Sequence, residues 1–157
     1  MTARLQENPA LKWGLTLGIP LGVLGAVNTL LLFKGAWGVG SLPQFFVVLV
    51  LFFAGGLLAT RASGEVAKGA IAGLIVGSLA TGLGGLTDIV LAIVAPREYA
   101  YIAGFDRLAD HPDRLVLTAL FALVISLIEY AIFGGGVGAL GGLVARRFAL
   151  AKPSAPR

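Results

Sequence analysis

The sequence contains no cysteine and only one histidine, His111. Without cysteine, the chain can form no disulfide and has no thiolate nucleophile or sulfur ligand for a metal. A single histidine cannot supply the cluster of imidazoles that transition-metal sites use. We therefore expect no metal and no cofactor, and we interpret His111, which stands between Asp110 and Pro112, as an ordinary loop residue.

Charge is also scarce. Charged residues make up 13% of the chain and hydrophobic residues 57%, whereas a soluble globular domain carries about 25% charged residues. A small soluble domain leaves much of its surface in water and could not bury so much apolar side chain. The composition therefore predicts a protein whose main solvent is lipid.

Long apolar runs with few or no charged residues predict a single all-α transmembrane domain over residues 1–157. A bilayer core about 30 Å thick needs roughly 20 apolar residues in a helix. Such runs predict four spans, at about 13–33, 45–62, 66–95 and 115–145, with an outer loop at 96–114 and a basic tail at 146–157. The last two spans would be ~45 Å long and should tilt, kink or project beyond the bilayer.

The distribution of Lys and Arg predicts the orientation of these spans. Eight of them fall on the side that holds both termini: Arg4, Lys12, Arg61, Lys68, Arg146, Arg147, Lys152 and Arg157. Four fall on the other side: Lys34, Arg97, Arg107 and Arg114. Because basic residues stay in the cytoplasm, we expect both termini there, with the first span retained as a signal anchor rather than cleaved.

The 23 glycines would cost a soluble helical protein about 1 kcal/mol each relative to alanine. In a membrane, small residues at every fourth position let helix backbones approach closely. The expected helix-packing residues are Gly14, Gly18, Gly22 and Ala26, then Gly69, Gly73, Gly77, Thr81 and Gly85, and finally Gly134, Gly138 and Gly142. The segment 136–141 also fits the dinucleotide pattern G-x-G-x-x-G, but it lies inside an apolar helical run, which favours packing.

Two carboxylic acids, Asp88 and Glu129, fall at hydrocarbon depth. Such acids are costly in lipid and should face protein or water. A helical projection centred on Ala122 points Glu129 and Ser126 into the bundle, and Asn28 lies at a depth similar to that of Asp88. Either these four polar residues form interhelical hydrogen bonds, or the acids bind a proton or ion along a path. A contact with a partner subunit or a lipid is the third alternative.

The segment 55–64, Gly-Gly-Leu-Leu-Ala-Thr-Arg-Ala-Ser-Gly, precedes Lys68-Gly69-Ala70 and the glycines that follow. Together with the Lys-Trp-Gly at 12–14 and the Pro-Arg-Glu-Tyr at 96–99, it resembles several families of small four-span prokaryotic membrane proteins of unknown function. The resemblance implies a prokaryotic cell (inner) membrane. It implies no catalytic or binding residues, because those families have no established activity.

For function, the sequence favours a non-enzymatic structural or accessory subunit that packs with itself or with a larger membrane complex. Glycine-rich faces and the lack of a soluble domain motivate this prediction, and no catalytic residues are expected. The alternative is a small oligomeric transporter or channel, coupled to ions or protons, that uses Asp88 and Glu129. The expected partners are membrane lipid and either a homo-oligomer or a larger complex. Nucleic acid is not expected, since the basic residues are scattered.

Overall fold

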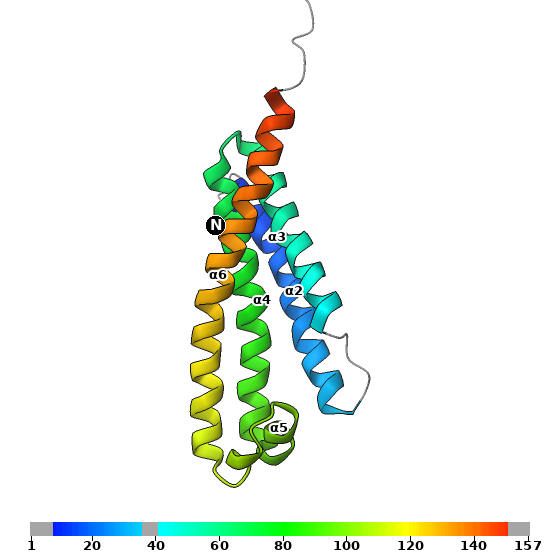
Figure 1. Cartoon of the computed structure of the whole chain (residues 1–157), viewed down its shortest axis with the longest axis vertical. Coiled ribbons are helices and arrows are strands. Elements are labelled where there is room, and N and C mark those ends of the chain that lie inside the picture. The colour runs from blue at the N-terminus through cyan, green and yellow to red at the C-terminus, as the bar shows by residue number, and fades with distance from the viewer. Residues whose placement is uncertain (1–7, 36–40, 151–157) are drawn as a thin grey trace, which may run out of the picture.

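The computed structural model describes residues 8–35 and 41–150, and this part of the chain is built from helices (Figure 1). The long helices are α2 (Pro9–Phe33), α3 (Ser41–Ser63), α4 (Val66–Val94) and α6 (Pro112–Leu150). Between α4 and α6 lie the short helix α5 (Pro96–Ile102) and the 3-10 turn η1 (Asp106–Leu108). In the described residues, four helices are long and apolar enough to cross a membrane. The prediction of an all-helical, multi-pass membrane protein is therefore confirmed.

Three of the four long helices, α2, α3 and α6, extend beyond the predicted spans. The first begins at Pro9, where the side chain of Asn8 caps it by accepting a hydrogen bond from the Ala10 N–H at 3.1 Å. The last has 39 residues, or about 58 Å, so it projects well past a bilayer core. Arg146 and Arg147, predicted to begin a tail, are part of this helix. The remaining tail, 151–157, and Arg4 lie outside the described residues.

The four long helices run alternately up and down, so the start of α2 and the end of α6 lie at the same end of the bundle (Figure 1). We call this the terminal end, and the opposite one the α5 end. The turn from α3 to α4 is tight because Gly64 adopts a φ of 78°, which residues with a Cβ rarely tolerate. Its N–H donates to the Thr60 carbonyl at 2.7 Å and closes α3.

Helix α4 is the centre of the bundle. It packs against α2, α3 and α6, while α2 and α6 make no contact with each other in the described part of the chain. Helix α3 completes the arrangement by contacting the other three. Every other long helix is therefore positioned through α4.

Glycines of α2 form a groove for large side chains of α4. The facing pairs are Gly14 with Ile75, Gly18 with Leu79, and Gly22 with Leu83. A Cβ added at Gly14 would lie 2.7 Å from the Cβ of Ile75, closer than real Cβ atoms come. On this side of α4, its large side chains pack against the glycines of α2.

On the other side of α4, backbone meets backbone. A Cβ at Gly73 would overlap the carbonyl of Gly134, and one at Gly138 would lie 2.6 Å from the carbonyl oxygen of Gly69. A Cβ at either of these positions would not fit at this separation of the two helices. The other predicted packing residues lie as follows: Gly77 at the Tyr130 carbonyl, Gly85 at Leu123, Gly142 at Thr60, and Ala26 half-buried.

The contact between α3 and α6 uses two glycines that the four-residue repeat did not include. A Cβ at Gly56 would overlap the carbonyl of Gly138, and one at Gly141 would overlap that of Phe53. The available signal was the pairing of glycines at 55–56 and 141–142. Adjacent residues of a helix point about 100° apart, so two adjacent glycines allow close contact with two different helices.

Candidate functional site

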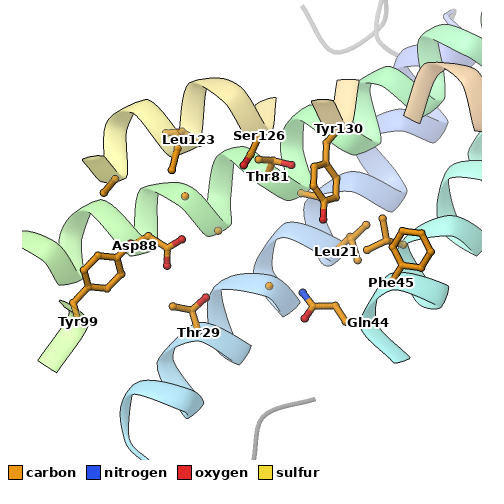
Figure 2. Close-up of a pocket in the computed structure, with 17 residues that line it drawn as sticks. Leu21, Thr29, Gln44, Phe45, Thr81, Asp88, Tyr99, Leu123, Ser126 and Tyr130 are labelled. Atoms are coloured by element: carbon orange, nitrogen blue, oxygen red, sulfur yellow. The ribbon is translucent and has the colours of Figure 1, made fainter. Parts of the chain in front are cut away.

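A cleft of about 590 Å³ lies between the long helices towards the α5 end (Figure 2). It forms because α2 and α3 diverge from α4 and α6 in that direction, whereas all four are drawn together at the terminal end (Figure 1). Its polar lining consists of Thr29, Gln44, Thr81, Asp88, Tyr99, Ser126 and Tyr130. Five elements therefore contribute hydrogen-bonding groups to one hollow inside an apolar bundle.

Asp88 is the one charged residue among the described residues that line the cleft. It projects from α4 into the hollow, towards the side where Thr29 and Tyr99 lie (Figure 2). The side chain is half-buried, and no described residue forms a hydrogen bond or ion pair with its carboxyl group. The carboxyl therefore faces the cleft with its hydrogen-bonding capacity unused by residues 8–35 and 41–150.

Tyr99 closes the α5 end of the cleft. The short helix α5 turns back against the bundle and places Tyr99 in an apolar cluster with Leu91 and Leu115, leaving only 7% of it exposed. Tyr101, on the same short helix, is by contrast 78% exposed.

Burial of the phenol, and secondarily the nearby Asp88 carboxyl, raise the pKa of Tyr99 to about 12. The neutral phenol is thus the form that the fold favours. Its contribution to stability is complete below pH 10.0 and is lost as the pH rises towards about 12. At neutral pH, Tyr99 therefore offers the cleft a hydrogen-bond donor and no charge.

A titration of tyrosinate absorbance tests this geometry. The part of the absorbance change that is lost in Tyr99→Phe belongs to Tyr99, and its midpoint should lie near pH 12. In Asp88→Asn the same component should shift to lower pH, because the neighbouring negative charge is gone, and yet stay above the ordinary tyrosine value because burial remains. An unchanged midpoint in Asp88→Asn would contradict the placement of the two side chains next to each other.

Asn28 and Ser126, both predicted as intramembrane polar residues, have different surroundings. The Asn28 amide donates to Gln44 Oε1 at 3.3 Å, which joins α2 to α3. Although the sequence places Asn28 at a depth similar to that of Asp88, the interhelical bond that it forms here is to Gln44. Ser126 lines the cleft from α6 (Figure 2), and Thr81, predicted as a packing residue, lines it from α4.

Glu129 does not point into the bundle, and the prediction that it does is wrong for the single chain. Its side chain is exposed. The projection had been centred on Ala122, but the buried face of α6 is the glycine face that includes Gly138. At about 100° per residue, Glu129 lies roughly 180° from Gly138. The two acids therefore do not share one site.

The described residues contain no group of three His, Cys, Asp or Glu side chains that could hold a metal ion. The G-x-G-x-x-G segment lies within α6, where Gly138 and Gly141 contact neighbouring backbones. A phosphate could not approach those glycines. The cleft, with its single acid and several neutral donors, is thus the site that the structure presents for a ligand.

These features define a multi-pass membrane protein with an intramembrane cleft that carries one acid. Comparison with protein-family models, with curated proteins and with solved structures finds no match. The resemblance to small four-span prokaryotic families therefore stays a prediction.

Four cleft residues had not been singled out from the sequence: Thr29, Gln44, Tyr99 and Tyr130. They come from four different elements, so no periodic pattern connects them. The one usable signal was that each interrupts, directly precedes or closely follows a long apolar segment.

Proposed function

We propose that this chain is a small, non-enzymatic membrane carrier that binds an organic cation at Asp88. The observation that supports it is the half-buried carboxyl that faces the cleft without a partner among the described residues. An acid inside a span costs about 2.5 kcal/mol or more on insertion scales and most often marks an ion, proton or substrate site. A carboxylate held in low dielectric attracts a positive charge more strongly than it would in water.

The dimensions of the cleft favour an organic ammonium compound over a dehydrated metal ion. A bare cation needs several oxygen atoms that converge at short range, whereas here a single carboxylate lines a hollow of about 590 Å³. That volume is within the range of small-molecule sites. The rings of Phe45 and Tyr130 also line it (Figure 2), and aromatic faces attract organic cations.

The proposal includes the orientation predicted from the Lys and Arg count. With both termini in the cytoplasm of a prokaryotic cell, the cleft opens towards the outside. The close glycine contacts, which we propose hold the bundle together, then close the cytoplasmic half. The structure corresponds in this proposal to an outward-facing carrier, and release to the cytoplasm would require α2 and α3 to part from α4 and α6 at the terminal end.

Equilibrium binding of tetraethylammonium to the protein in lipid nanodiscs tests the proposal. We expect saturable binding to wild type and roughly tenfold or weaker affinity in Asp88→Asn, since one ion pair in a partly desolvated site is lost. Asp113→Asn, which removes an exposed acid at the start of α6, is the matched control and should bind as wild type. Equal binding to all three proteins would contradict the assignment of Asp88 as the cation-binding residue.

A second candidate is the structural or accessory subunit that the sequence favoured. The exposure of Glu129 on the outer surface of α6 supports it, because an acid at mid-span calls for a protein neighbour. If a correctly folded protein neither binds nor transports the cation, the structural or accessory role would be the remaining proposal. Native mass measurement of the gently solubilised protein would then identify the complex to which it belongs.

A further inference from the structure

The outer face of α6 carries an acid at mid-depth that the bundle leaves uncovered. Glu129 is exposed, and α6 lies at the edge of the bundle (Figure 1). Its neighbour Tyr130 has its carbonyl against Gly77, well inside α4. Both helices thus place Glu129 far from either membrane surface, where an acid requires protein or water around it.

Residues three, four and seven positions apart share this face. We call them the seam: Ile125, Glu129, Ile132, Gly136 and Leu143, all exposed. Ile132 is 72% exposed, and a Cβ added at Gly136 would meet nothing within 4 Å. A seven-residue repeat is the spacing with which two helices stay in contact along a left-handed pair. Gly136, seven residues after Glu129, would let two such helices approach closely.

We propose that the seam binds a second copy of this chain, in a parallel dimer whose two-fold axis lies along the membrane normal. Copies that insert with the same topology place each residue at equal depth across such an axis. Glu129 of one copy therefore meets the partner's Glu129. A neutral carboxyl group both donates and accepts hydrogen bonds, so two of them satisfy each other.

The chemistry of the chain favours this occupant over others. Every Lys and Arg in the described residues lies near a helix end or in a connection, so none of these described cations reaches Glu129. Lipid acyl chains offer no hydrogen bond at that depth. Two copies of Glu129 can face each other only where a symmetry axis passes next to them. Contact between two seams would place the axis at that position.

Cysteine cross-linking in native membranes tests the dimer, and the chain contains no cysteine that would interfere. Ile125→Cys and Ile132→Cys should each form a disulfide-linked dimer under mild oxidation. Val124→Cys is the matched control: it is 54% exposed but points away from the seam, and should stay monomeric. Equal cross-linking at 124 and 125, or cross-links from the seam to a different protein, would overturn the proposal.

The role of the acid is tested separately by measuring dimerisation in mixed micelles. Glu129→Leu should weaken it about tenfold, while Glu129→Gln, which keeps a donor and an acceptor, should change it little. Binding of tetraethylammonium, or the thermal transition where no cation binds, reports whether each variant is folded. Unchanged dimerisation of a folded Glu129→Leu would overturn the pairing of the two acids. Because the dimer does not depend on Asp88, its failure would leave the carrier proposal standing, and the reverse also holds.

Discussion

Alanine at position 138 is expected to destabilise the bundle by about 1–3 kcal/mol, even though alanine is the better helix former. A Cβ there would lie 2.6 Å from the Gly69 carbonyl oxygen and 3.0 Å from the Gly73 Cα. Both are backbone atoms, so relief requires α4 and α6 to move apart. That movement would also disturb the Gly56 contact of α3 with Gly138. Reversible unfolding in mixed micelles measures the loss.

Gly135→Ala is the matched control, three residues away on the same helix. The nearest atom to a Cβ at Gly135 is the Ala70 carbonyl oxygen at 3.7 Å, an ordinary contact. Here the helix-propensity gain of about 1 kcal/mol is unopposed, so stability should be unchanged or higher. The same chemical change thus has opposite expected signs at two nearby glycines. Equal effects at both positions would show that close backbone contact is not what position 138 provides.

Cysteine at position 29 is expected to react with an impermeant thiol reagent about tenfold faster, or more, than cysteine at position 60, because thiol reactivity follows access to the reagent. Thr29 lines the cleft (Figure 2). Thr60 is 2% exposed, and its hydroxyl lies against Gly69 and Gly142 at the closed terminal end. Both substitutions start from threonine. The native chain supplies a cysteine-free background.

The side from which the reagent acts tests the orientation as well. Thr29→Cys should react in right-side-out vesicles, and tetraethylammonium should slow the reaction by occupying the cleft. Labelling only in inverted vesicles would reverse the proposed topology. Equal, fast labelling of both cysteines would mean that the terminal half is not closed.

The membrane-spanning helices were accessible from sequence because burial in lipid acts on each segment separately. The charge-free run between Lys34 and Arg61, and the run between Arg114 and Arg146 that only Glu129 interrupts, identify helices whatever they pack against. The helix ends were less certain. Continuation of α6 through Arg146 and Arg147 depends on backbone hydrogen bonding that hydropathy does not measure.

The glycine repeat predicted that helices approach closely, but it could not say which ones. The repeat in α2 receives large side chains of α4, whereas the repeat in α4 meets that of α6 backbone to backbone. A repeat of small residues marks a surface and carries no information on its partner.

What the sequence by itself determined is local: four long apolar helices, their alternation, and the presence of two acids at hydrocarbon depth. Only the tertiary structure decided that Asp88 faces a cleft and Glu129 the outside. Periodicity gives the angle between two residues on one helix. Which direction around the helix faces the bundle is set by the neighbouring helices. Residues distant in sequence, such as Gly69 on α4 and Gly56 on α3, set the buried face of α6 through their contacts with that helix.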